Sequence, residues 1–231
     1  MIILDERIGG QRLILGDCLK VMPLLGRFDA VVTDPPYGIN YVSTLGGLGA
    51  KKHKAISGDD GTLDLSLILK ADCPVLVFGA NHFPNDLPHR GRWLCWDKRT
   101  IDGAADKMLG SAFELAWCNK TSGYDKIVRV LHGGVVNADG GKRVHPTQKP
   151  IQVMAESILW AAIDAQTILD PFMGSGTTLV ACQRMGRNGT GIELDPDYFD
   201  IACRRVDEAT RQPDLLITPP APQPVQEDFG L

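Results

Sequence analysis

The strongest constraint on the fold of this chain is the alternation of short apolar runs with helical patterns. Runs rich in β-branched and aromatic residues, bounded by turn residues, predict buried strands. Helical patterns follow Pro150, Gly176 and the pair Asp195-Pro196, where apolar residues recur at helical spacing. Strands that alternate with helices predict an α/β fold with a doubly wound, mostly parallel sheet. The predicted strands are 12–15, 29–33, 74–78, 92–96, 113–118, 166–169 and 189–194.

The length of 231 residues suits one large domain, which we expect to span residues 1–210. Residues 38–61 contain many glycines, and we expect a mobile loop there. Prolines become frequent after Arg211, so residues 211–231 are expected to form a disordered tail. The net charge of -4 gives no overall sign of a polyanionic partner. Any surface that binds nucleic acid therefore has to be local.

The six cysteines are scattered and form neither a CxxC pair nor a Cys/His cluster, which argues against a metal site and a disulfide framework. The N-terminal stretch MIILDERIGG has an acid within its short apolar start, unlike a signal peptide, and no apolar run reaches membrane length. We therefore expect a metal-free protein of a reducing cytoplasm.

The stretch TDPPYG at residues 33–38 directly follows an apolar run. Neither Pro35 nor Pro36 can donate to a sheet ladder, so the chain has to leave the sheet there in a stiff turn. Asp34 and Tyr37 are thereby presented at the carboxyl end of a strand, where ligands bind in open α/β sheets. An ordinary rigid turn is the alternative for an Asp-Pro pair taken alone.

A second motif, DPFMGSGTT, passes at residues 170–178 from a strand into a helix. Its glycines allow a ligand to approach the backbone closely. It lacks the P-loop lysine and the full GxGxxG pattern, which argues against a nucleoside triphosphate and against hydride transfer. Asp170 can hold a ligand ammonium group, and Glu193, at the end of the next strand, can accept from ribose hydroxyls. This combination suits S-adenosylmethionine, although a glycine turn that only packs a helix on a strand is the alternative.

With TDPPYG, HPTQKP at residues 145–150 and DPFMGSGTT in that order, the chain resembles the DNA amino-methyltransferases, which methylate N6 of adenine or N4 of cytosine. The order of the motifs matches the circularly permuted beta group, and the resemblance runs from about Arg12 to Arg205. It implies a Rossmann-like, S-adenosylmethionine-dependent methyltransferase fold. It assigns catalysis to Asp34, Pro35, Pro36 and Tyr37. It assigns cofactor binding to Asp17, Cys18, Asp34, His145, Thr147, Gln148, Lys149, Asp170, Phe172, Gly174, Ser175, Gly176, Thr177, Glu193 and Leu194.

The resemblance also explains the chemistry of the first motif. An exocyclic amine of a nucleobase is a poor nucleophile because its lone pair is delocalised into the ring. Asp34 and the Pro35 carbonyl can accept from its two hydrogens and aim the lone pair at the methyl group, while Tyr37 stacks on the flipped base. Asp in the first position favours adenine, by resemblance alone. N4-cytosine, an RNA or protein amide acceptor, and a non-catalytic DNA-binding module remain as alternatives.

Double-stranded DNA is the expected partner. The segment 120–143, where such enzymes read their target, is short, so we expect short or relaxed recognition unless a second subunit of a homodimer contributes. Enzymes of this compact kind occur in restriction-modification systems, phages and prophages, and the sequence favours none of these settings. The candidates for phosphate contacts, each of which is alternatively a solvated surface residue, are Lys51, Lys52, Lys54, Lys98, Arg99, Lys142 and Arg143.

Overall fold

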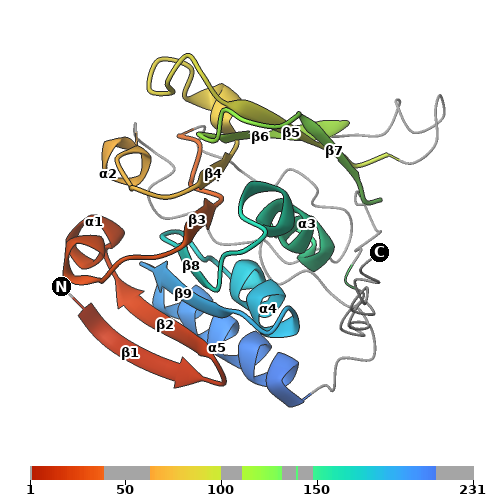
Figure 1. Ribbon diagram of the computed structural model, residues 1–231. Coiled ribbons are helices and arrows are strands. Elements are labelled where there is room, and N and C mark those ends of the chain that lie inside the picture. Colours follow the sequence, from red (N-terminus) through yellow and green to blue (C-terminus); the bar gives the residue numbers. More distant parts are fainter. Residues whose placement is uncertain (1, 39–62, 100–110, 132–138, 140–147, 212–231) are drawn as a thin grey trace, which may run out of the picture.

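The computed structural model describes residues 2–38, 63–99, 111–131, 139 and 148–211. These residues form an α/β fold around one nine-stranded sheet (Figure 1). In spatial order the strands are β1 (Ile2–Ile8), β2 (Gln11–Gly16), β9 (Asn188–Glu193), β8 (Thr167–Asp170), β3 (Ala30–Thr33), β4 (Val75–Phe78), β6 (Phe113–Cys118), β5 (Arg92–Asp97) and β7 (Lys126–Arg129). The strands from β2 to β4 are parallel, whereas β1 and β6 run antiparallel to their neighbours.

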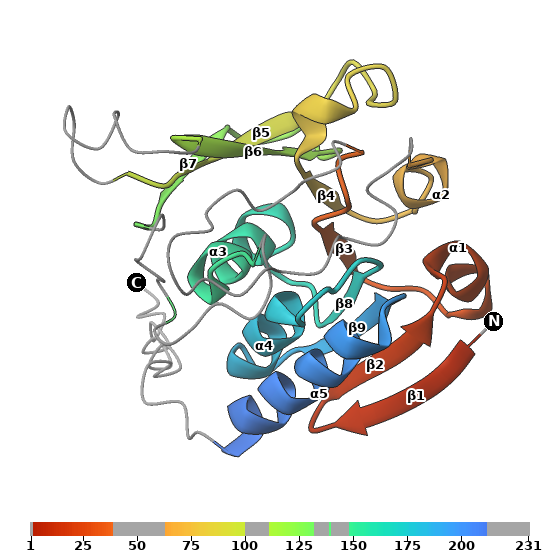
Figure 2. The ribbon, with the colours of Figure 1, turned by 180° about the vertical axis from the view of Figure 1, so that it is seen from behind.

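Helices cover both faces of this sheet, so the protein has three layers. Two opposite views show one group of three helices on one face and two shorter helices on the other (Figures 1 and 2). The first group is α3 (Ile151–Ala161), α4 (Thr177–Arg184) and α5 (Pro196–Arg211), and the second is α1 (Cys18–Val21) and α2 (Ser66–Leu69). Short 3₁₀ helices lie at Met22–Leu24 and Ala80–His82.

Each face of the sheet has its own apolar core. On β3, Ala30 and Val32 pack into the core with α3, α4 and α5, whereas Val31 packs into the core with α1 and α2. Successive side chains of a strand point to opposite faces, so a strand between two layers has to be apolar throughout. This requirement explains the apolar runs at residues 30–32 of β3 and 75–78 of β4.

The chain changes faces at the boundary between β8 and β3. From β8 it continues through α4 to β9, and from β3 it continues through α2 to β4 on the other side. Helices α4 and α2 contribute to opposite cores. In open α/β sheets such a switch point, at the carboxyl ends of the strands, is where ligands bind. The topology therefore directs attention to the residues that follow Thr33 and Asp170.

The structure confirms the doubly wound, mostly parallel sheet predicted from the sequence. Each predicted strand is present with ends within one residue of the prediction, and α3, α4 and α5 are the predicted helices. Strands β1 and β7 were not predicted. Both lie at edges of the sheet, and β1 is largely exposed.

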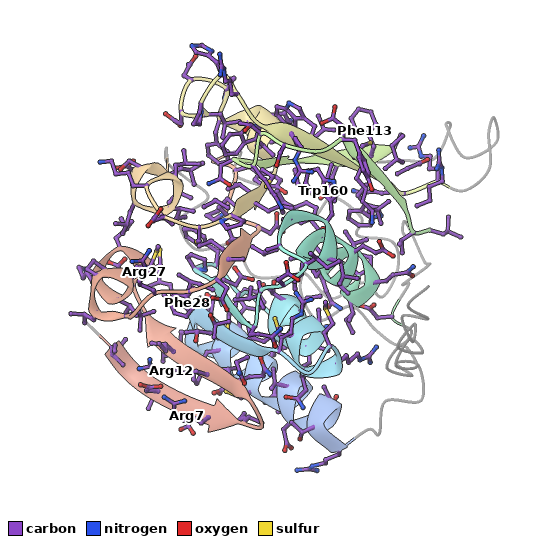
Figure 3. All side chains as sticks on the ribbon, in the orientation of Figure 1. Arg7, Arg12, Arg27, Phe28, Phe113 and Trp160 are labelled. Carbon is purple, nitrogen blue, oxygen red and sulfur yellow. The ribbon has the colours of Figure 1, made fainter. Side chains whose placement is uncertain are left out.

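Near both edges, polar and aromatic side-chain contacts add to the backbone pairing of the strands. On β2, Arg12 reaches the neighbouring strand β1, where its Nε and Nη2 donate to the Asp5 carboxylate at 2.9 and 2.7 Å (Figure 3). At the opposite edge, Trp160 of α3 packs under the Arg92 guanidinium, whose carbon lies 4.4 Å from the ring centroid. Figure 3 shows Trp160 between α3 and the strands above it.

Several predictions concern segments outside the described residues. These are the expected mobile loop apart from residue 38, most of the expected tail, and residues 132–138 and 140–143 of the recognition segment. Within the described ranges, no helix combines the length and apolar character needed to cross a membrane. The candidate site residues that lie outside the described part are Lys51, Lys52, Lys54, Lys142, Arg143, His145 and Thr147.

Candidate active site

The two principal motifs meet at the switch point. Because β3 and β8 are adjacent and parallel, their carboxyl ends place Asp34 beside Asp170 at the same edge of the sheet. The Thr33 hydroxyl donates to Asp170 Oδ1 at 2.8 Å, so a direct hydrogen bond joins the two motifs. Both residues of this bond are buried, which shields it from competition with water.

The Tyr37 side chain folds back over the turn that carries it. Its hydroxyl donates to Asp34 Oδ1 at 2.6 Å, and its ring stacks on His82 with centroids 4.8 Å apart and an interplanar angle of 12°. Gly79, at the end of β4, also packs against this ring. A Cβ atom at Gly79 would lie 2.0 Å from Tyr37 Cε1. Gly79 also has a φ of +64°, which favours glycine. The ring therefore has a defined position.

Lys149 points its ammonium group at the same carboxylate. Lys149 Nζ lies 2.5 Å from Asp34 Oδ2 and 2.9 Å from Glu114 Oε2, and only 5% of the Lys149 side chain is exposed. Glu114 in turn forms an ion pair with Lys98. We call Asp34, Lys149, Glu114 and Lys98 the charge row, because their charges alternate in sign along it.

The topology explains how the charge row assembles. Strand β6 is antiparallel to β4, so its first residues lie at the edge where the parallel strands end. Glu114 is the second residue of β6, and Lys98 follows the last residue of β5, which pairs with β6. Lys149 comes from the turn before α3. Residues from four parts of the chain thus meet at one edge.

The charges of the row set one another's pKa values. Burial raises the pKa of Asp34, although the Lys149 ammonium acts against this effect. Burial acts to lower the pKa of Lys149, but Asp34 and Glu114 outweigh it and raise that pKa well above its ordinary value. Burial also acts to raise the pKa of Glu114, but Lys149 and Lys98 outweigh it and lower that pKa to about 2. Lys149 and Glu114 are therefore both charged at neutral pH.

The glycine turn after β8 is held from behind by α5. Gly176 has a φ of +79°, and a Cβ atom there would lie 2.9 Å from the Cβ of Ala202. Arg205 of α5 donates from Nη1 to the Ser175 carbonyl at 2.6 Å, to Ser175 Oγ at 2.8 Å and to Thr177 Oγ1 at 3.1 Å. The hydroxyls of Ser175 and Thr177, which the sequence assigned to a cofactor, are thus engaged by Arg205.

The Asp170 carboxylate accepts hydrogen bonds from three other residues. Besides Thr33, Thr178 donates to Asp170 Oδ2 at 2.5 Å and the Phe172 backbone N–H donates to Oδ1 at 3.1 Å. Burial raises the pKa of Asp170 to about 6, against the lowering effect of these donors. These bonds fix the strand end and the start of the turn to each other.

Glu193 and Asp17 stand at the ends of the next two strands, β9 and β2. The Asp195 backbone N–H donates to Glu193 Oε1 at 2.7 Å, and burial raises the pKa of Glu193 to about 7. Asp17 caps α1 by accepting from the Leu19 N–H at 3.1 Å. Cys18 is buried, and burial raises the pKa of its thiol to about 11, with Asp17 and Glu193 as lesser influences.

The described candidates therefore fall into two groups. Asp34, Tyr37, Lys149 and Asp170 are linked through hydrogen bonds and ion pairs, and Gln148 is buried beside Lys149 in the chain. Lys98 is part of the charge row. Its expected contact with DNA phosphate stays a prediction, as does that of Arg99. The remaining described candidates line the adjacent strand ends and the glycine turn: Asp17, Cys18, Pro35, Pro36, Phe172, Gly174, Ser175, Gly176, Thr177, Glu193 and Leu194.

Sequence reasoning missed Glu114, Arg205, Gly79 and His82. Glu114 lies in an apolar strand and meets Lys149, 35 positions later, only through the sheet. Arg205 has the helical spacing of a packed residue and gives no sign of its bonds to the turn. For Gly79 and His82 the sequence did offer a signal. Both follow directly after a predicted strand, and loops at strand ends often carry functional residues.

Comparison with known proteins finds a matching family model, similar sequences and similar solved structures. The model of a family described as DNA methylase matches residues 97–204. The Type II methyltransferase M.HpaI of Haemophilus parainfluenzae is 25% identical over 234 residues, which covers 85% of this chain and 74% of that protein. The solved structure of the M1.HpyAVI–SAM complex has a TM-score of 0.53 and 20% identity, with 84% of this chain and 99% of that chain covered. The cytosine-N4-specific PvuII DNA methyltransferase has a TM-score of 0.57 and 15% identity, with 88% and 91% covered.

At these identities the two solved structures establish a shared fold, and the sequence matches show similarity to DNA methyltransferases. The matched range contains Glu114, Lys149, Asp170 and the glycine turn. M.HpaI extends the similarity over most of the chain. In these matches, and in the three motifs in their order, the chain is similar to the DNA amino-methyltransferases of the N6-adenine or N4-cytosine type.

Proposed function

We propose that this protein transfers a methyl group from S-adenosylmethionine to N6 of adenine in double-stranded DNA. The observation that carries the proposal is the 2.8 Å hydrogen bond from Thr33 to Asp170, because it fastens the acceptor motif to the glycine turn. A methyl transfer needs its donor and its acceptor amine within bonding distance and in line. Two motifs joined by one buried hydrogen bond meet that need.

Asp34 and the Pro35 carbonyl are the proposed acceptors for the hydrogens of the target amine. Asp34 Oδ1 and Oδ2 each already accept one hydrogen bond, from Tyr37 and Lys149. A carboxylate oxygen has two lone pairs, so Asp34 can still accept from the amine. Pro35 is buried and its ring fixes φ, which keeps its carbonyl in place. Transfer is direct, and no enzyme nucleophile takes part.

Tyr37 is the proposed surface for the flipped base. Its ring is only partly buried, and His82 stacks on it. A base inside a duplex is inaccessible to an enzyme, so it has to be extruded and stacked on such a platform. The hydrogen bond to Asp34 orients the ring relative to the proposed acceptors.

The residues present fit S-adenosylmethionine, which supplies an activated methyl group on sulfur. Glu193, at the end of β9, offers a carboxylate for ribose hydroxyls. Gly174 and Gly176, with φ values of 51° and 79°, make a turn without side chains against which a ligand can lie. Asp17 and Cys18 stand at the next strand end, where the adenine of the cofactor is proposed to lie.

Adenine is preferred over cytosine because the catalytic tetrapeptide begins with Asp34, which in this family resemblance accompanies adenine. The same two acceptors would also suit N4 of cytosine. We propose short or relaxed sequence recognition, since β7 takes residues 126–129 of the already short segment 120–143 into the sheet. A homodimer that shares recognition remains part of this proposal.

Incubation with methyl-labelled S-adenosylmethionine and DNA, followed by mass spectrometry of the nucleosides, tests the proposal. N6-methyladenine is expected. N4-methylcytosine would overturn the choice of base, and label found only in RNA or protein would overturn DNA as substrate. Sequencing of the methylated positions reports the site, and a long, strictly read site would contradict relaxed recognition.

Asp34→Ala is expected to abolish turnover and to leave S-adenosylmethionine binding, measured by calorimetry, largely intact. The reason is that Asp34 is proposed to hold the target amine and not the cofactor. Asp72→Ala is the matched control, because Asp72 is 92% exposed and pairs only with Arg27 among the contacts of the described residues. An Asp34→Ala protein that still methylates DNA would contradict the assigned role.

A further inference from the structure

Glu114 is a partly buried carboxylate, with 24% of its side chain exposed, that the proposed chemistry does not use. It stands at the carboxyl edge of the sheet among the site residues, and its two oxygens face two different ammonium groups. Neither its position in the apolar strand β6 nor its sequence neighbours require a charge there. Placing a carboxylate in such a site costs free energy unless it is paired, so its partners indicate what it does.

The key partner is Lys149, which Glu114 shares with Asp34. The Lys149 ammonium lies 2.5 Å from Asp34 Oδ2 and 2.9 Å from Glu114 Oε2. It is nearly inaccessible to water, so these carboxylates are its main charged neighbours among the described residues. An ammonium between two carboxylates divides its attraction between them.

This division matters for the strength of Asp34 as an acceptor. A cation bound to a carboxylate withdraws electron density and lowers its pKa, which weakens the hydrogen bonds that it accepts. If Lys149 bound Asp34 alone, Asp34 would be held firmly but would accept weakly from a target amine. Glu114 counters this effect in two ways: it draws the ammonium toward itself, and its negative charge acts on Asp34 directly.

We propose that Glu114 is a positioning residue that shares the Lys149 ammonium with Asp34 and so keeps the Asp34 carboxylate a strong acceptor for the target amine. This inference rests on the proposed function. Lys98 opposes this effect of Glu114. Its ion pair with Glu114 limits how strongly Glu114 attracts the Lys149 ammonium. Glu114 and Lys98 together thus determine how strongly the Lys149 ammonium interacts with the Asp34 carboxylate.

Other groups near Asp34 can also influence its protonation. The Tyr37 hydroxyl donates to it, and the Asp170 carboxylate lies close enough to be affected by its charge. His82 stacks on the Tyr37 ring. These groups are left unchanged in the variants below, so they contribute equally to each pH profile.

The test is the pH dependence of kcat for DNA methylation by Glu114→Gln. Removing the negative charge lowers the pKa of Asp34, so the acidic limb of the kcat profile should move to lower pH by about one unit. The plateau of kcat should fall about tenfold because the acceptor is weaker. The KM for S-adenosylmethionine should not change. Lys98→Met should move the limb in the opposite direction, to higher pH, since Glu114 then competes more strongly for Lys149.

Glu156→Gln is the matched control. Glu156 forms a comparable ion pair with Lys126, 2.5 Å away, on α3 and outside the charge row. It should keep the wild-type profile, and Glu114→Asp should recover part of the kcat lost in Glu114→Gln. Circular dichroism verifies the fold of each variant, and if Glu114→Gln did not fold, the shift in Lys98→Met decides.

The outcomes separate this inference from the function on which it rests. Wild-type protein that methylates no DNA would overturn the proposed function. Active wild-type protein with an unshifted limb in both Glu114→Gln and Lys98→Met would overturn only the role of Glu114. A loss of kcat in Glu114→Gln that Glu114→Asp does not relieve, with no shift of the limb, would also reduce Glu114 to a structural residue.

Discussion

Glu193 shows how burial of a single side chain can make ligand binding depend on pH. Burial raises the pKa of Glu193 to about 7, with a backbone N–H of Asp195 acting against it. Above that pKa the group is a carboxylate, which accepts strong hydrogen bonds from hydroxyls. Below it, one oxygen carries a proton and the acceptor is weaker. If Glu193 binds the ribose, affinity for S-adenosylmethionine should therefore increase as the pH rises through about 7.

The prediction is that Glu193→Gln binds S-adenosylmethionine about tenfold more weakly at high pH, since a hydrogen bond to a charged group is worth about 1.5–3 kcal/mol. It should also lose the dependence on pH, because the amide does not titrate. Calorimetric titrations of both proteins from below to above the pKa measure this. Equal affinity of the two proteins at all pH values would show that Glu193 does not hold the ribose.

At the same scale, the sequence predicts the site in part. Asp34 and Asp170 are visible because each ends an apolar run and begins a turn motif, a local pattern. Lys149 was predicted to contact the cofactor, which stays a prediction; the structure adds its contacts with Asp34, Glu114 and the Tyr37 hydroxyl. Glu114 was not predicted at all, because its role depends on strand pairing between distant segments and on the antiparallel direction of β6.

Among the elements, the apolar strands were predictable and the edge strands were not. Strands β3 and β4 contribute side chains to both cores, so their sequences contain apolar runs. Strand β1 is exposed along most of its length and carries Asp5, Glu6 and Arg7. Its pairing with β2 rests on backbone hydrogen bonds and on the ion pair of Arg12, neither of which leaves a hydrophobic pattern.

The end of β4 offers a test of how one element positions the Tyr37 ring, which is proposed to stack on the target base. Gly79→Ala should destabilise the protein by roughly 1–3 kcal/mol more than backbone strain alone, because its Cβ would overlap the Tyr37 ring. It should also lower kcat by displacing that ring. Gly186→Ala is the control, since Gly186 has a similar φ of +65° but nothing within 4 Å of the added atom. Its expected cost is about 1–2 kcal/mol from the left-handed conformation only.

Urea denaturation and kcat measured on both variants distinguish strain from overlap. Equal destabilisation of the two, with full activity in Gly79→Ala, would mean that the contact between Gly79 and Tyr37 has no functional weight.

In the whole molecule, the central parallel strands lie between the two apolar cores and contribute side chains to both. Strands β8 and β3 come from opposite halves of the sequence and lie side by side, so neither half can complete its core alone. Such a centre should open only when the entire protein unfolds.

Hydrogen exchange followed by mass spectrometry is expected to show the slowest exchange in β3, β8 and β9. Exchange should be faster in β7, which pairs on one side only within the described sheet and carries the exposed Ile127. Protection of β7 equal to that of β8 would contradict this order of stability and would place β7 in a larger cooperative unit.

The buried hydrogen bond between Thr33 and Asp170 has a consequence for how the two halves of the reaction communicate. Neither strand end can shift without pulling on the other. In the proposed reaction the methyl donor lies at the Asp170 turn and the base at Asp34, so binding of either ligand is expected to influence binding of the other, with equal strength in both directions. The two ligands should bind with mutual, thermodynamically linked preference, and a Thr33→Val protein should lose that linkage while retaining each separate affinity.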